Sequence, residues 1–295
     1  MELPVIQPTR KPEGQPPIFS RIGIVGLGLI GGSIALAARE LWPASLVVAV
    51  DNKDVLETAM RLHAIDVAAD DAIVLAEADV VILAAPVRQN IALLAELDEN
   101  VRTPAIVTDT GSTKRAVIDA ARQLPPRFTF VGGHPLGGGS HGGLEHARPD
   151  LFSGRPWLFT PAGDGSGEAV EKLSAFARAL GAQPRSLSPE AHDRLLAFLS
   201  HLPQLTASAL MEVVGDAVGE DGLALSGRGL IDTTRLAASP AGIWTDIAAT
   251  NADEIGPALD ALIGVLQDLR RDLPSGERLT EIFAEAERWR KVLAP

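Results

Sequence analysis

The feature that most constrains the fold is a short apolar run followed by a segment of helical length, repeated along the first half of the chain. The apolar runs are nearly continuous and lie at 21–26, 45–51, 79–86, 104–111 and 128–135. Such runs are typical of parallel strands that are buried on both faces. Because Ala-, Leu- and Glu-rich segments separate them, the pattern predicts βαβ units around a parallel sheet. Two later runs, 155–161 and 184–188, extend the predicted sheet.

The first apolar run ends in a glycine pattern. Gly26-x-Gly28-x-x-Gly31 directly follows the predicted strand and opens a helix. The first glycine allows a tight turn, the second lets the backbone approach a pyrophosphate, and the third lets the helix pack on the strand. The helix N-terminus then faces the phosphates. This arrangement predicts a Rossmann-type domain that binds a dinucleotide.

Asp51 ends the next predicted strand. A carboxylate at this position accepts hydrogen bonds from ribose hydroxyls and repels a 2′-phosphate, which favours NAD over NADP. The structural alternative is a glycine turn with a capping aspartate. The other cofactor contacts are expected beside the turn and at the ends of neighbouring strands, at Leu29, Ile30, Ala85, Pro86, Thr110 and Gly111.

Composition excludes several functional classes. The net charge of −12 argues against nucleic acid or an anionic membrane as the main partner. No apolar run has the length of a membrane span, and the N-terminal segment has no apolar core of signal-peptide length. The chain contains no cysteine, which excludes disulfides and thiol catalysis, and we expect a cytoplasmic protein. No metal site is predicted.

The pattern changes after Pro189, where helical periodicity replaces the strand pattern. We predict a flexible Pro-rich arm at 1–19, a Rossmann-type domain at 20–189 and an all-helical domain at 190–295.

Two polar side chains follow neighbouring predicted strands. Ser112 lies in the "DTGSTK" segment, where its hydroxyl and the Lys114 amine either cap a helix or touch a ligand. His134 lies at the carboxyl end of the next strand and is our candidate proton acceptor, since histidine titrates near neutral pH. A loop histidine bonded to backbone is the alternative. Arg235 lies in an apolar and hydroxyl-rich stretch, and a buried arginine there needs a carboxylate from the protein or from a substrate.

These residues belong to a series of motifs, and with them the chain resembles the prephenate/arogenate dehydrogenase family of tyrosine biosynthesis. The motifs are "GLGLIGGS" (26–33), "DTGSTK" (109–114), "GGHPLGG" (132–138), "ARPDLF" (147–152), "HDRLLAFLSHLPQ" (192–204), "DTTRLAASP" (232–240) and "IW" (243–244). The resemblance implies NAD-dependent oxidative decarboxylation of prephenate to 4-hydroxyphenylpyruvate, or of arogenate to tyrosine. It also implies that the helical domain forms a homodimer.

The resemblance also implies roles for individual residues. His134 would take the ring-hydroxyl proton, Ser112 would orient it, and Arg235 would hold a substrate carboxylate. The remaining residues of the substrate site would be His201, Gln204, Trp244 and Ser140, supported by His192 and Asp193.

The chain departs from the family pattern at two of these positions. Gln204 replaces a common histidine, and Ser140 stands where an acidic residue is often found. Neutral Gln204 favours prephenate over the ammonium-bearing arogenate.

Two other classes are compatible with a dinucleotide-binding domain. A β-hydroxyacid type dehydrogenase would use a lysine on a helix of the second domain, but residues 190–270 contain no lysine. An NAD-binding sensor without activity would have no need of Ser112, His134 and Arg235 together.

Overall fold

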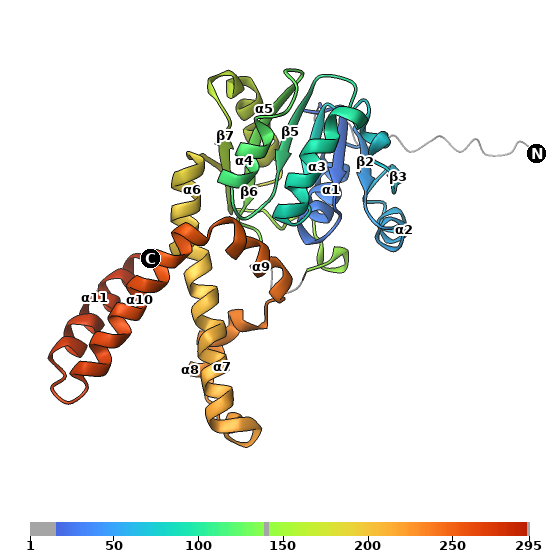
Figure 1. Cartoon of the computed structure of the whole chain (residues 1–295). Coiled ribbons are helices and arrows are strands. Elements are labelled where there is room, and N and C mark those ends of the chain that lie inside the picture. Colours follow the sequence, from blue (N-terminus) through green and yellow to red (C-terminus); the bar gives the residue numbers. More distant parts are fainter. Residues whose placement is uncertain (1–15, 139–141, 294–295) are drawn as a thin grey trace, which may run out of the picture. The chain divides into compact units, whose positions relative to one another are not determined.

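The first unit of the chain is built on an eight-stranded sheet (Figure 1). The computed structural model is described for residues 16–138 and 142–293. The strands follow the order β3-β2-β1-β4-β5-β6-β7-β8. Their bounds are β1 Arg21–Val25, β2 Leu46–Val50, β3 Val67–Ala69, β4 Val80–Leu83, β5 Ala105–Asp109, β6 Phe128–Pro135, β7 Pro156–Pro161 and β8 Gln183–Ser186.

The predicted Rossmann-type sheet is confirmed, with a change of direction at its far end. Strands β1 to β6 are parallel, whereas β7 pairs antiparallel with β6 and β8 runs parallel to β7. Antiparallel neighbours need no helical crossover. The described part of the β6–β7 connection contains only the short 3₁₀ helix η2 (Leu144–His146). Strand β3 was not predicted, because three residues are too few to give a strand pattern.

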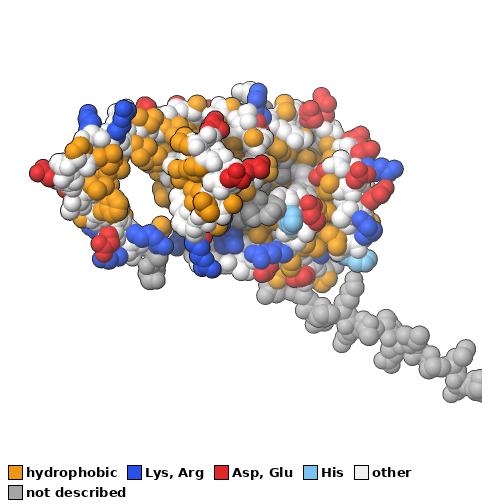
Figure 2. Space-filling view, turned by 90° about the horizontal axis from the view of Figure 1, so that it is seen from below, with side chains coloured by type: hydrophobic (Ala, Val, Ile, Leu, Met, Phe, Trp, Pro, Cys, Tyr) orange, Lys and Arg blue, Asp and Glu red, His pale blue; other side chains and the backbone are white. Residues whose placement is uncertain are grey.

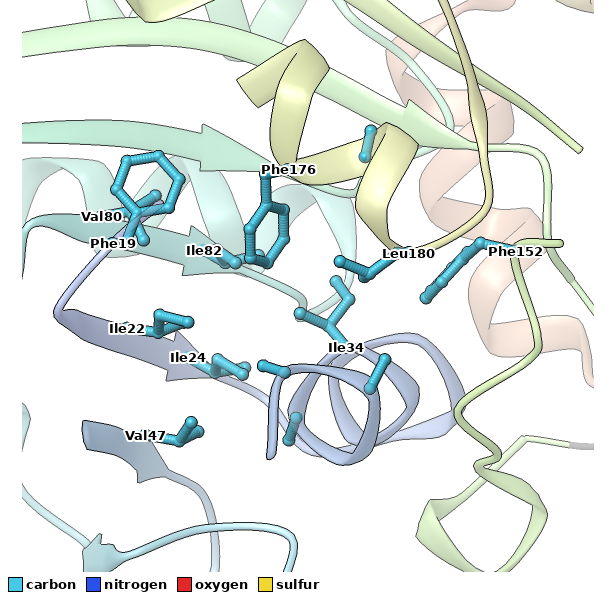
Figure 3. Close-up of a cluster of buried hydrophobic side chains, with 14 of the residues drawn as sticks. Phe19, Ile22, Ile24, Ile34, Val47, Val80, Ile82, Phe152, Phe176 and Leu180 are labelled. Carbon is cyan, nitrogen blue, oxygen red and sulfur yellow. The ribbon is translucent and has the colours of Figure 1, made fainter. Parts of the chain in front are cut away.

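Helices cover both faces of the sheet. Their bounds are α1 Leu29–Leu41, α2 Lys53–Arg61, α3 Val87–Asn100, α4 Arg115–Ala121 and α5 Gly167–Ala179, with 3₁₀ turns η1 Ala72–Leu75 and η3 Asp164–Ser166. On one face, Ile22 and Ile24 of β1 pack with Ile34 of α1 and Phe176 of α5 (Figure 3). On the other face, strands β4 and β5 pack with α3 and α4. The near-continuous apolar runs are explained by burial on both sides.

The hydrophobic core of the sheet-bearing unit includes a residue that precedes β1. Phe19 is only 4% exposed, and its ring meets the ring of Phe176 edge-on at 5.7 Å (Figure 3). The flexible arm predicted for 1–19 therefore does not extend to Phe19, whose aromatic ring is part of the core. Residues 1–15 of that predicted arm lie outside the described residues.

The rest of the chain is helical, as predicted. The bounds are α6 Pro189–Leu196, the π-helical turn η4 Ala197–His201, α7 Leu202–Leu223, α8 Arg228–Thr234, η5 Arg235–Ala238, α9 Ala241–Thr250, α10 Ala252–Asp272 and α11 Glu277–Leu293. Pro203 does not interrupt this region, because it lies in the first turn of α7, where a proline is tolerated. Within the two described ranges, no helix combines the length and apolar character needed to cross a membrane.

Contacts divide the chain into two units at positions that differ from the predicted boundary. The sheet-bearing unit continues to Asp193 and also includes Ala238–Thr250, while the helical unit contains Arg194–Ala237 and the residues from Asn251 onward. Helix α9 is tied to the sheet-bearing unit by a hydrogen bond of 2.8 Å between the hydroxyls of Thr113 and Thr250. Helical periodicity identifies a helix but not the unit on which it packs.

The Phe19 contact can be tested by truncating its side chain. We expect Phe19→Ala to lower the free energy of unfolding by about 3–5 kcal/mol, because it leaves a cavity against Phe176. Urea unfolding followed by circular dichroism measures the loss. The matched control is Ile73→Ala at a side chain that is 56% exposed, with an expected loss below about 1 kcal/mol. Equal small losses in both variants would contradict a core role for Phe19.

Candidate functional site

The predicted site residues of the first unit gather at one edge of the sheet. Strands β1, β4, β5 and β6 are parallel neighbours, so their carboxyl ends lie at the same edge. Gly26, Ala85 and Gly111 follow their strands, and His134 is the next-to-last residue of β6. In open α/β sheets this edge is where ligands bind.

The three glycines of the turn are required for different reasons. Gly26 has φ +93°, and a Cβ there would lie 2.8 Å from the Ala84 carbonyl oxygen. A Cβ on Gly31 would lie 1.9 Å from the Gly26 carbonyl oxygen. A Cβ on Gly28, by contrast, meets no described atom within 4 Å. The fold therefore explains Gly26 and Gly31, while Gly28 at the N-cap of α1 keeps backbone open to the approach of a ligand.

Asp51 is held in place at the end of β2, beside this turn. One carboxylate oxygen accepts the backbone N–H of Leu27 at 2.6 Å, and the other accepts the backbone N–H of Asn52 at 2.6 Å and its side-chain amide at 2.8 Å. A carboxylate offers about four acceptor positions, so these three bonds leave capacity for a hydroxyl. The residues fit a dinucleotide: an open glycine for the pyrophosphate and an oriented carboxylate for the ribose.

The segment after β4 depends on a residue that the sequence analysis missed. Asn90 is fully buried in α3, where its amide donates to the Leu83 carbonyl at 3.2 Å. Its side-chain oxygen accepts the backbone N–H of Ala85 at 3.1 Å. This shapes the turn at Ala85 and Pro86, two of the predicted cofactor contacts. The sequence signal for this role was a polar amide at a position of α3 that is otherwise suited to a buried apolar side chain.

A buried carboxylate, Asp109, joins the two strands that carry the predicted catalytic residues. Its oxygens accept the backbone N–H of Gly111 at 2.8 Å and that of Gly133 at 3.0 Å. These N–H groups lie one residue before Ser112 and one before His134. The carboxylate thereby fixes the backbone at both positions.

Lys114 forms an ion pair with Asp109, and both side chains are fully buried. Burial lowers the pKa of Lys114, whereas the charge of Asp109 acts in the opposite direction. The two roles considered for this amine, capping a helix or touching a ligand, are both wrong. The amine instead balances the carboxylate that holds the strand ends, and the cue was the pair Asp109 and Lys114 at the two ends of "DTGSTK".

Ser112 is not the cap of the helix that follows. Helix α4 begins at Arg115 with Lys114 at the N-cap. Its first N–H groups are bound by a distant side chain: the Asp193 carboxylate accepts from Lys114 N at 2.7 Å and from Arg115 N at 2.9 Å. This leaves the half-buried Ser112 hydroxyl without a capping role. Its predicted catalytic role stays a prediction.

His134 is the next-to-last residue of β6 and belongs to a chain of buried polar groups. It is 8% exposed, and its Nδ1 lies 2.9 Å from Nε2 of His192. Nδ1 of His192 in turn lies 2.8 Å from a carboxylate oxygen of Asp193. Burial lowers the pKa of His192, although the bond to Asp193 acts against this shift. Burial raises the pKa of Asp193, whereas hydrogen bonds from His192 and from the backbone of Arg115 and Lys114 lower it. Together these hydrogen bonds outweigh burial, so the pKa of Asp193 is lowered.

Three predicted substrate residues lie in the helical unit. Gln204 is buried, and its amide donates to the Leu236 carbonyl at 2.8 Å, which fixes the backbone beside Arg235. His201 is buried at the end of η4, with its Nδ1 3.3 Å from the side-chain amide of Asn251. The expectation of a buried Arg235 is wrong, because its side chain is exposed where α8 runs into η5. Apolar neighbours in sequence did not predict burial there, because Leu230 and Leu236 are themselves only half-buried.

The other two predicted substrate residues are placed differently. Trp244 is half-buried on α9, which belongs to the sheet-bearing unit. Ser140 lies outside the described residues. Among the residues that are described, no group of three His, Asp or Glu side chains is arranged to hold a metal ion.

A Rossmann-type sheet with a dinucleotide turn and a buried His–His–Asp chain at its carboxyl edge defines the class of nicotinamide-dependent oxidoreductases. Two family models identify the particular family. Residues 34–185 match the nucleotide-binding domain of prephenate dehydrogenase, and residues 188–285 match its dimerization domain. The chain belongs to the prephenate dehydrogenase family.

Individual relatives agree with this assignment. The chain is 34% identical to a prephenate dehydrogenase of Bacillus subtilis, over 92% of this chain and 75% of the relative. It is 32% identical to a cyclohexadienyl dehydrogenase of Zymomonas mobilis, over 94% and 97%. A prephenate dehydrogenase from A. aeolicus, solved with hydroxyphenyl propionate and NAD⁺, superposes with a TM-score of 0.86 at 28% identity and covers 93% of this chain and 98% of its own.

Asp193 is predicted to stabilise the fold through its charge. We expect Asp193→Ala to lower the free energy of unfolding by about 3 kcal/mol at pH 7, because Lys114 N, Arg115 N and His192 lose a charged acceptor. The pKa of Asp193 is lowered in the folded state, so this contribution is present above the unfolded value of about 3.9 and is lost as the pH falls through the folded value.

Urea unfolding of wild type and variant at pH 7 and near pH 3 measures both quantities, and the difference should shrink at the lower pH. The control is Asp119→Ala on helix α4, whose N-terminus Asp193 binds; the Asp119 carboxylate is 66% exposed, and a change within about 0.5 kcal/mol is expected. A difference for Asp193→Ala that does not depend on pH would contradict a stabilising carboxylate.

Proposed function

We propose that the protein catalyses the NAD-dependent oxidative decarboxylation of prephenate to 4-hydroxyphenylpyruvate, with arogenate as the alternative substrate. Membership of the prephenate dehydrogenase family supports this reaction class. The observation that carries the proposal is His134, a histidine backed by buried polar groups at the sheet edge that also bears the dinucleotide turn.

The chemistry assigns a task to each residue at this edge. The turn at Gly28 and the carboxylate of Asp51 would hold NAD⁺, which would supply the acceptor for a hydride from C4 of the substrate ring. His134 accepts the proton of the ring hydroxyl at the same stage and returns it to the oxygen once the ring is aromatic. Loss of the ring carboxylate as CO₂ makes the ring aromatic and drives the reaction. Ser112 orients the histidine and the hydroxyl.

We assign the substrate contacts of the helical unit to Arg235, His201 and Gln204. No carboxylate among the described residues pairs with Arg235, and a planar guanidinium suits a substrate carboxylate. Gln204 is a neutral amide, whereas an ammonium-bearing substrate such as arogenate calls for an acidic group. This difference favours prephenate. The roles of Trp244 and Ser140 stay predictions from the resemblance.

We assign NAD, rather than NADP, as the cofactor. Support comes from the oriented carboxylate of Asp51 beside the turn and from the open backbone at Gly28. The other predicted contacts surround these two at Gly26, Leu29, Ile30, Gly31, Ala85, Pro86, Thr110 and Gly111.

We further assign a homodimer built on the helical unit. The matched dimerization domain supports it, and so do large apolar side chains at the surface of α10 and α11 (Figure 2). The most exposed of them, on these helices and the turn between them, are Ile263, Leu266, Leu273, Phe283, Trp289, Val292 and Leu293. The cytoplasmic location and the absence of nucleic-acid and membrane partners stay predictions from the sequence.

The reaction is tested by NADH formation from NAD⁺ with prephenate and with arogenate offered separately. We expect turnover with a higher kcat/KM for prephenate. His134→Asn should lower kcat by about 10²–10⁴-fold, because the proton acceptor is lost, while NAD⁺ binding measured by calorimetry stays nearly unchanged. No turnover of either substrate would refute the proposed reaction, and wild-type turnover in the variant would refute the role of His134.

The cofactor preference is tested at Asp51. We expect Asp51→Ser to raise the ratio of kcat/KM for NADP to that for NAD by at least about tenfold, because a charge-assisted ribose contact and a repulsive charge are both removed. Initial rates with each cofactor measure the ratio. The control is Asp54→Ser on the exposed face of α2, where the ratio should not move. An unchanged ratio in Asp51→Ser would assign the preference to other groups.

A further inference from the structure

We propose that Asp193 and His192 act as a positioning pair that fixes His134 in one tautomer, with its Nδ1 protonated and its Nε2 unprotonated. The tautomer itself is a property of the folded chain. Its consequence for catalysis rests on the proposed function.

The argument begins at Asp193, whose carboxylate is fixed on both oxygens. One oxygen accepts Lys114 N at 2.7 Å, and the other accepts Arg115 N at 2.9 Å and Arg115 Nε at 3.2 Å. An ionised carboxylate is an acceptor only. The 2.8 Å contact between Asp193 and His192 therefore requires that Nδ1 of His192 carries the hydrogen.

The second step passes this constraint to His134. Neutral histidine has one N–H, so a protonated Nδ1 leaves Nε2 of His192 as an acceptor. The 2.9 Å contact then requires Nδ1 of His134 to donate. Neutral His134 consequently has an unprotonated Nε2. A base must present such a lone pair to take a proton from a hydroxyl.

The charges around His192 keep it neutral. The charged and titratable groups that act on it are His134 of β6, Asp109 of β5, Lys114 at the N-cap of α4, and Asp193 of its own helix, which also pairs with Arg115. Burial lowers the pKa of His192, and the Lys114 charge lowers it further, whereas Asp193 and Asp109 raise it; the net shift is downward. A neutral His192 accepts a hydrogen bond from His134 and does not compete with it for the proton.

The pair also determines what happens after His134 takes a proton. The His134 imidazolium still donates its Nδ1–H to His192, and this charge-assisted bond stabilises the cation. Asp193 already accepts two backbone N–H groups and has a lowered pKa, so the proton stays on His134. Removing the acceptor at His192 should therefore lower the pKa of His134 and release its tautomer.

The first readout is independent of the reaction. Long-range ¹H–¹⁵N spectra of the full chain labelled at histidine distinguish the two tautomers, with His134→Asn used to assign the His134 signals. We expect Nδ1–H for both His134 and His192 in the wild type. His192→Gln, whose side-chain oxygen can accept the same bond, should keep Nδ1–H at His134, and His192→Leu should lose it. Nε2–H at His134 in the wild type would overturn the proposal, even if a His192 variant failed to fold.

The second readout is kinetic. His192→Leu should lower kcat by about 10–100-fold and move the acid limb of kcat/KM to lower pH, while His192→Gln restores both in large part. A purely structural role would lower activity or stability without moving the limb. The matched control is His63→Asn in an exposed turn with φ +54°, a conformation that asparagine adopts readily. An unmoved limb in His192→Leu would overturn the positioning role.

The two readouts separate the proposals. If the wild type turns over neither substrate, the proposed function fails, and the spectra still decide the tautomer. If the wild type is active but the tautomer and the limb are unaffected by His192→Leu, the positioning pair fails and the function stands.

Discussion

The candidate site depends on one buried carboxylate. Asp109 ends β5 and accepts backbone N–H groups from Gly111 on one side and Gly133 on the other. Parallel strands bring their ends to the same edge, but pairing stops where the ladder stops, and the residues beyond it need other partners. Asp109 supplies the partner at the point where Ser112 and His134 emerge. Asp109 therefore links the backbone before Ser112 to the backbone before His134, which also lies in the β6–β7 ladder.

A second carboxylate, Asp193, binds the backbone of Lys114, while Asp109 pairs with its side chain. Asp193 binds the N–H groups of Lys114 and Arg115 and, through His192, reaches His134. Buried ion pairs are weak sources of stability, because desolvating the charges costs about as much as their attraction returns. This network adds hydrogen bonds with fixed directions, which apolar packing cannot replace. The contacts of this network place the ring of His192 against His134.

Strand and helix periodicity predicted most of the sheet and the helical second half, because those patterns reflect local burial. The patterns could not predict the direction of β7, the three-residue β3, or the packing of α9 on the sheet-bearing unit, which depend on contacts between segments distant in sequence. The same limit applies to side chains. The sequence predicts that the Lys114 amine caps a helix or touches a ligand, but this side chain is fully buried in an ion pair. The sequence indicates burial for Arg235, whose side chain is exposed.

In the glycine turn at 26–31, the structure distinguishes the glycines that the fold requires from the one that it does not. Gly26 and Gly31 are dictated by the chain, since any Cβ there would collide with backbone. Gly28 is not, since a Cβ would meet no described atom within 4 Å. At the N-terminus of the helix in this turn, a glycine that the fold does not require suits the close approach of a ligand to the backbone. By this reasoning Gly28 is more informative about the cofactor than the two glycines beside it, and Asp51, fixed by the Leu27 N–H within the same turn, indicates where the ribose would lie.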